Sequence, residues 1–143
     1  MTMRDLHNNI TIGSSVHAVA IGTTGTGKTT AAVDTAGYNG VEFLFDYGAI
    51  TSATAVYTVL MTECDTVSGS YTSVADTDLL GTEALAALGA ATRTDGTGDN
   101  LTKKLGYIGS KRFVKAKLSS TATAGSPISI ISILHSPRHA PTS

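Results

Sequence analysis

The clearest strand pattern in the sequence is Val41-Glu42-Phe43-Leu44-Phe45-Asp46-Tyr47. Large apolar side chains occupy every second position: Val41, Phe43, Phe45 and Tyr47. Glu42 and Asp46 lie between them. Because successive side chains of a strand point to opposite faces, this alternation predicts a strand with one buried and one solvated face.

Further short strands are expected on both sides of this stretch. They cover residues 17–21, 29–35, 56–63, 71–75, 105–108, 112–118 and 128–134, with a hairpin turn at 65–69. The last strand, Ile128 to Leu134, has apolar residues on both faces, so we expect it to be central or bulged. Only Thr82 to Leu88 predicts a helix, since it consists of strong helix formers and stops at Gly89.

The composition agrees with a β-rich chain. The 143 residues include 23 Thr and 14 Ser but no Trp, and Thr favours strands whereas Ser and Gly favour turns. About eight short strands predict an all-β fold, an antiparallel β-sandwich or jelly-roll-like barrel with one short helix. The expected organisation is an N-terminal arm (1–15), a β-sandwich domain (16–134) and an extended, proline-containing C-terminal tail (135–143).

Charge and cysteine content argue against several classes of protein. The net charge of −1 is unlike that of a general nucleic-acid binder, which is normally basic. The single cysteine, Cys64, cannot form an internal disulfide. The first residues lack the apolar core of a signal peptide, and no apolar run is long enough to span a membrane. We therefore expect an intracellular origin, with neither a membrane nor nucleic acid as a direct partner.

Residues 22–29, Gly-Thr-Thr-Gly-Thr-Gly-Lys-Thr, match the phosphate-binding pattern G-x-x-x-x-G-K-[ST]. In a true P-loop, backbone amides surround the phosphates, the lysine meets the β and γ groups, and the threonine hydroxyl holds magnesium. The run Phe43 to Asp46 also resembles the apolar strand whose terminal aspartate gives a second magnesium contact.

The segment after this pattern does not suit a P-loop, because the phosphate site needs a helix directly after the glycine-rich turn. Residues 29–37 are rich in β-branched side chains and end at a glycine, so a helix there would be short and weak. We interpret four residues as part of a loop between strands: Gly22, Gly27, Lys28 and Thr29. No catalytic residue and no cofactor is expected. A P-loop nucleotide-binding protein is the alternative from the enzyme class.

Other polar residues give no metal site. The histidines are spread over the chain, and the close pair His135 and His139 lies in a proline-containing tail that cannot place both on one helix face. Six of the ten basic residues fall within 103–117: Lys103, Lys104, Lys111, Arg112, Lys115 and Lys117. They form either a solvated strand face or a docking stripe for an acidic partner surface.

Several segments carry a resemblance to a known family. They are Asp76 to Glu83, Leu105 to Lys115 and His135 to Pro141, together with Met3 to Ile10 and Val41 to Leu44. These segments resemble a family of small structural proteins encoded among the head genes of tailed bacteriophages and related prophages. The resemblance spans most of the chain and contains no catalytic signature.

The resemblance implies a non-enzymatic virion protein, most simply a capsid decoration (cement) protein. It would be made in the cytoplasm of the host bacterium, bind the outer surface of the phage head and bridge subunits of the major capsid protein. A homo-oligomer is expected, with a trimer favoured. The expected contact residues are Arg4, Leu6, Lys115, Lys117 and Arg138. The alternative within the virion is a turret, connector or tail component. A carbohydrate-binding sandwich is disfavoured because the chain has no Trp.

Overall fold

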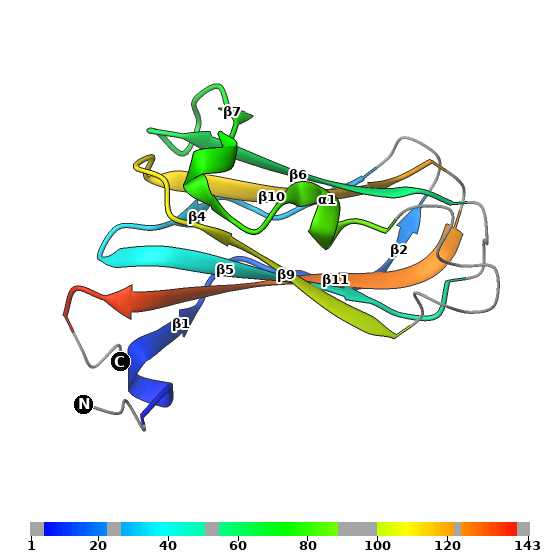
Figure 1. Cartoon of the computed structure of the whole chain (residues 1–143), viewed down its shortest axis with the longest axis horizontal. Coiled ribbons are helices and arrows are strands. Elements are labelled where there is room, and N and C mark those ends of the chain that lie inside the picture. Colours follow the sequence, from blue (N-terminus) through cyan, green and yellow to red (C-terminus); the bar gives the residue numbers. More distant parts are fainter. Residues whose placement is uncertain (1–4, 23–26, 51–54, 89–99, 122–123, 140–143) are drawn as a thin grey trace.

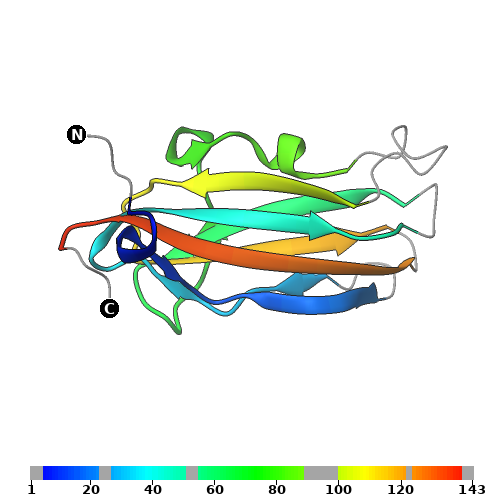
Figure 2. The same ribbon diagram turned by 90° about the horizontal axis from the view of Figure 1, so that it is seen from below.

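The computed structural model of the chain describes residues 5–22, 27–50, 55–88, 100–121 and 124–139. Over these ranges two antiparallel sheets pack face to face as a β-sandwich, with one short α-helix at the side (Figures 1 and 2). The predicted all-β sandwich with one short helix is confirmed. The sequence has a polar segment at 92–100, Thr-Arg-Thr-Asp-Gly-Thr-Gly-Asp-Asn, and all of it except Asn100 lies outside the described residues.

The larger sheet, sheet A, has six strands within the described ranges. They are β1 (Ile10–Ile12), β2 (Val16–Gly22), β5 (Tyr38–Tyr47), β8 (Leu79–Leu80), β9 (Leu101–Tyr107) and β11 (Ala124–Pro137). Their order is β1-β11-β5-β9-β8, and β2 also pairs with β11. Since β5 occupies one edge of β11, β1 and β2 follow one another along its other edge. The prediction that the last strand is central is therefore confirmed.

The smaller sheet, sheet B, has five strands over the same ranges. They are β3 (Lys28–Thr29), β4 (Val33–Asp34), β6 (Tyr57–Cys64), β7 (Thr72–Ser73) and β10 (Phe113–Ser120). Their order is β3-β10-β6-β7, with β4 also paired to β10. The predicted hairpin around 65–69 is present, because β6 and β7 pair antiparallel.

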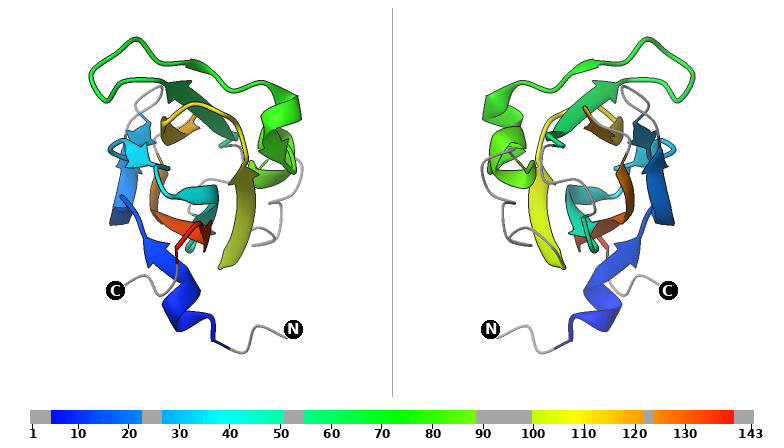
Figure 3. Two further views of the ribbon diagram at one scale, coloured as in Figure 1. Left: turned by 90° about the vertical axis from the view of Figure 1, so that its left-hand side faces the viewer. Right: turned by 90° about the vertical axis from the view of Figure 1, so that its right-hand side faces the viewer.

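Among the described residues, three short helical elements lie outside the sheets: η1 (His7–Asn9), η2 (Asp76–Asp78) and α1 (Glu83–Ala86). Helix α1 begins after Thr82, whose hydroxyl accepts a hydrogen bond from the Leu85 amide at 3.1 Å. The segment from β7 to α1 passes from sheet B to the β9 edge of sheet A (Figure 3). There the Lys103 ammonium donates to the carbonyls of Leu85 and Ala87 and holds the end of α1.

The core lies between the sheets and follows the predicted alternation. The side chains of Phe43, Phe45 and Tyr47 are fully buried, while Asp46 on the opposite face is exposed. The inward faces of β6 and β10 show the same alternation: Tyr57, Val59, Met61, Val114, Ala116 and Leu118 are buried. The rings of Tyr47 and Tyr57 meet edge to face at 5.7 Å, a favourable aromatic geometry that joins the two sheets.

The two ends of the chain are more tightly built into the sandwich than the sequence suggests. Within the expected arm, Ile10–Ile12 forms β1 and pairs with β11. Within the expected tail, residues 135–137 belong to β11, and Pro137 pairs with Tyr38. A three-residue edge strand has too few alternating positions to stand out in a sequence. Within the expected arm, η1 lies before β1 at one end of the sandwich (Figure 3).

Candidate functional site

The P-loop-like residues are divided between the two sheets. Gly22 ends β2 in sheet A, whereas Lys28 and Thr29 form β3 in sheet B and pair with β10. A strand therefore follows Gly27, where a P-loop has a helix. Asp46 lies on β5 of sheet A and accepts a hydrogen bond from the Thr102 hydroxyl at 2.8 Å. The lysine and the aspartate of the pattern thus lie on different sheets. Residues 23–26 lie outside the described part of the chain.

Gly27 has a packing role in this structure. A Cβ atom at this position would lie 2.7 Å from the Leu118 carbonyl oxygen and 2.8 Å from Cε of Lys117. The glycine lets the chain pass close to β10 as it enters sheet B. Close strand approach explains this glycine without a phosphate ligand.

The six basic residues at 103–117 do not form one surface. Lys103 and Lys104 belong to β9 in sheet A, whereas Lys115 and Lys117 lie on the outer face of β10 in sheet B. A single docking stripe made of all six residues is therefore wrong, because β9 belongs to sheet A and β10 belongs to sheet B. Lys103 is bound to the carbonyls of α1.

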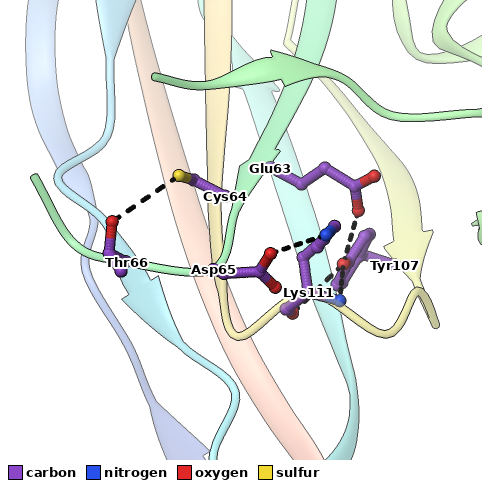
Figure 4. Close-up of polar contacts among 6 residues, drawn as sticks. All are labelled: Glu63, Cys64, Asp65, Thr66, Tyr107 and Lys111. Carbon is purple, nitrogen blue, oxygen red and sulfur yellow. Dashed lines mark hydrogen bonds and ion pairs between the residues drawn. The ribbon is translucent and has the colours of Figure 1, made fainter. Parts of the chain in front are cut away.

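Lys111 belongs to a cluster of polar groups at the β9–β10 connection (Figure 4). Its ammonium pairs with Asp65 at 2.6 Å. Its backbone amide donates to the hydroxyl of Tyr107 at 3.1 Å, and that hydroxyl donates to Glu63 at 2.6 Å. Burial, followed by the Glu63 carboxylate, raises the pKa of Tyr107 well above its ordinary value. The phenol therefore stays protonated: it donates to Glu63 of β6 and accepts from the Lys111 amide, which ties the loop to sheet B.

Arg112 is held by Asp34 in a two-pronged ion pair. Its Nε and Nη2 atoms donate to the two carboxylate oxygens at 2.9 and 2.8 Å. This hydrogen bond lowers the pKa of Asp34. The Lys115 ammonium lies 3.8 Å from the centroid of the Tyr71 ring, a cation–π contact.

The structure places the expected contact residues in two groups. Leu6, at the N-cap of η1, is 65% exposed, and Arg138, just beyond β11, is also exposed. Both lie toward the same end of the sandwich, because Ile10 of β1 pairs with His135 of β11. Lys115 and Lys117 lie together on the other sheet and are half-buried. Arg4 lies outside the described residues.

A polar hollow of about 480 Å³ lies at the end where β11 stops. Three segments enclose it: the β4–β5 turn, the β9–β10 loop and Arg138. We call it the Arg112/Arg138 hollow after the two guanidinium groups that line it. No sequence pattern indicates this hollow, because its walls come from three distant parts of the chain.

A second hollow, of about 470 Å³, is lined mainly by apolar groups and includes Ile12, Val16 and Ile131. We call it the Ile12/Ile131 hollow. It lies where β1 ends and β2 begins on the same edge of β11. Between them Gly13 approaches β11 so closely that a Cβ atom would lie 2.5 Å from Ser132 Oγ. Ile12 is 59% exposed and Ile131 is 37% exposed.

The described residues contain neither a cluster of metal ligands nor a helix that could cross a membrane. Within them, no three His, Cys, Asp or Glu side chains gather as metal ligands do. The Glu83 carboxylate accepts a hydrogen bond from the Met61 amide. In this part of the chain, no helix has the length and apolarity to cross a membrane.

Comparison with solved structures shows a distant likeness of fold. The chain is similar to the CBM22-1–GH10 modules of an N-terminal endo-1,4-beta-D-xylanase 10B from Clostridium thermocellum, solved with xylohexaose. The TM-score is 0.44 and the sequence identity 8%, with 96% of this chain and 28% of the xylanase chain covered. This chain thus spans little more than a quarter of that protein, and a match at this level carries no argument about function. No protein-family model and no curated protein matches the sequence.

Proposed function

We propose that the protein is a non-enzymatic virion structural protein, a capsid decoration protein that binds the outer surface of a phage head and bridges capsid subunits. The observation that carries the proposal is the exposed apolar surface near the N-terminus. Leu6 and Ile12 are 65% and 59% exposed, and Ile12 borders the Ile12/Ile131 hollow. Exposed apolar patches rimmed by polar residues are typical of protein–protein contacts.

The architecture supports the same proposal. Two sheets joined by a fully buried core form a rigid body, and rigid partners lose little conformational freedom when they bind. The polar groups expected at a P-loop lie on different sheets, and the tyrosine with a strongly shifted pKa serves as a structural donor. The resemblance to small proteins encoded among phage head genes supplies the partner, the major capsid protein. As a decoration protein, the chain would act as an oligomer, with a trimer favoured.

Particle composition tests this proposal. Particles produced by the strain that encodes the chain are separated on a density gradient, and the copy number per particle is measured by quantitative mass spectrometry. A decoration protein is expected in DNA-filled heads at many copies, in a fixed ratio to the major capsid protein. Absence from particles would contradict a virion role. A count near that of a tail or connector protein would contradict decoration in favour of that alternative.

A further inference from the structure

Backbone hydrogen bonds tie together the three segments that enclose the Arg112/Arg138 hollow. The Thr35 amide donates to the Arg112 carbonyl at 2.8 Å, which ties the β4–β5 turn to the β9–β10 loop. The Arg138 amide donates to the Gly37 carbonyl at 2.8 Å, which ties the end of β11 to the same turn. Gly37 has a φ of +88°, a conformation that suits glycine. The hollow is therefore pre-formed.

The far wall of the hollow is held by Tyr107. Its hydroxyl accepts from the Lys111 amide at 3.1 Å, and its ring lies so close to Gly109 that a Cβ atom there would be 2.6 Å from it. These contacts with Tyr107 hold the loop that carries Ser110 and Arg112 in place. A site whose donors are fixed before binding loses less entropy when a ligand arrives.

The charged side chains that line the hollow favour a ligand with a single negative charge. The described residues that line it include two arginines and no aspartate or glutamate. Asp34 neutralises Arg112 by binding two of its nitrogens, but the pair leaves further N–H groups of the guanidinium free to donate. Among the described residues, none forms a hydrogen bond or ion pair with the Arg138 side chain. The uncompensated charge of the hollow is therefore that of one guanidinium.

We infer that the Arg112/Arg138 hollow binds the carboxylate of an aspartate or glutamate side chain on a partner protein. Guanidinium groups bind planar carboxylates through paired hydrogen bonds, which gives geometric specificity as well as energy. The free charge of Arg138 matches a carboxylate of charge −1 better than a phosphate of about −2. This inference rests on the proposed function for the partner, a capsid subunit, and supplies the chemistry of one contact.

The test uses the whole protein labelled with ¹⁵N and three probes in low salt. The probes are the peptides acetyl-Ala-Glu-Ala-amide and acetyl-Ala-Gln-Ala-amide and inorganic phosphate. The acidic peptide is expected to shift the amide signals of residues 35–39 and 108–112. The affinity should fall as salt is added, because screening weakens the contact. The neutral peptide is expected to leave these signals unchanged.

The variant Arg138→Gln is expected to weaken binding of the acidic peptide at least tenfold, about the loss of one charge-assisted contact. Lys104→Gln is the matched control, because it removes one positive charge from an exposed side chain on the outer face of sheet A. It should leave the affinity within about twofold of the original protein. Since the Arg138 side chain is exposed, an unchanged thermal midpoint will show that the variant is folded.

Three results would overturn the inference: equal binding of the glutamine peptide, equal or tighter binding of phosphate, or the same loss from Lys104→Gln as from Arg138→Gln. The titration needs no virion. A protein that binds the acidic peptide but is absent from particles would keep this site and refute the proposed function. A protein that is found in particles but does not bind the acidic peptide would keep the proposed function and refute this site.

Discussion

The hydroxyl of Tyr107 joins three parts of the molecule through its contacts with Glu63 and with the backbone amide and carbonyl of Lys111. Removing it in Tyr107→Phe leaves a half-buried carboxylate and an amide without their partner. The variant is expected to lose about 1–3 kcal/mol of unfolding free energy, measured by urea denaturation. Tyr71→Phe is the control, since its hydroxyl donates to the Val67 carbonyl in an exposed turn and its loss should cost under about 0.5 kcal/mol. Equal losses would contradict a special role for Tyr107.

Two carboxylates predict opposite responses to pH. Burial raises the pKa of Glu42, against the opposing charges of Lys104 and His135, whereas the hydrogen bond from Arg112 lowers the pKa of Asp34. A raised pKa means that ionised Glu42 destabilises the folded state, so Glu42→Gln should be more stable than the original protein at pH 7. That difference should vanish as the pH falls below 4.5, the ordinary pKa of the group.

Asp34→Asn should show the reverse. Its lowered pKa means that the charged form stabilises the fold, so the variant should be less stable at pH 7. The difference should disappear as the pH falls from the ordinary value of 3.8 through the lower pKa of the folded state. Thermal midpoints across pH 2–8 test both variants, and differences of the same sign would contradict the assignment.

Elements with regular alternation were predictable, and those set by contacts between distant residues were not. Strand β5 was evident because four apolar side chains recur at every second position and are all buried. The strand expected over 29–35 is divided into β3 and β4, because the Thr30 hydroxyl accepts from the Ala116 amide at 3.1 Å in place of a backbone carbonyl. Strands β1 and β8 have too few residues to show a period.

The candidate site shows the same division. Exposure of Leu6 and Arg138 agrees with their expected role in contacts, but their common end depends on the pairing of β1 with β11. The Arg112/Arg138 hollow depends on three segments that meet only in the folded chain. Local sequence patterns do not predict contacts between segments that lie far apart in the sequence.

The glycine of the P-loop-like pattern gives a prediction for one element. Gly27→Ala places a Cβ atom against the Leu118 carbonyl, so it is expected to cost about 1–3 kcal/mol of stability through overpacking. Lys28→Ala should cost much less, since Lys28 lies in a two-residue edge strand. Both variants are measured by thermal unfolding with and without Mg-ATP or Mg-GTP. A midpoint that rises with nucleotide, and no longer rises in Lys28→Ala, would contradict the packing role and support a phosphate site.

For the whole molecule, the exposed apolar residues of the N-terminal segment predict which face meets the capsid. Leu6→Asp is expected to weaken rebinding to particles at least tenfold without lowering the thermal midpoint, because its side chain is 65% exposed. Leu85→Asp is the matched control, since Leu85 on α1 is 70% exposed but lies beside β9, away from β1. Equal weakening by both variants in a sedimentation assay would contradict this orientation.

The proposed decoration of a phage head is tested most directly by electron cryomicroscopy of particles that lack the protein. Purified protein is added back and the two reconstructions are compared. Extra density is expected on the outer surface of the head, repeated by the capsid symmetry. The two-sheet sandwich should fit this density with its η1 end against the shell. Density confined to the portal or tail, or no difference between the reconstructions, would contradict it.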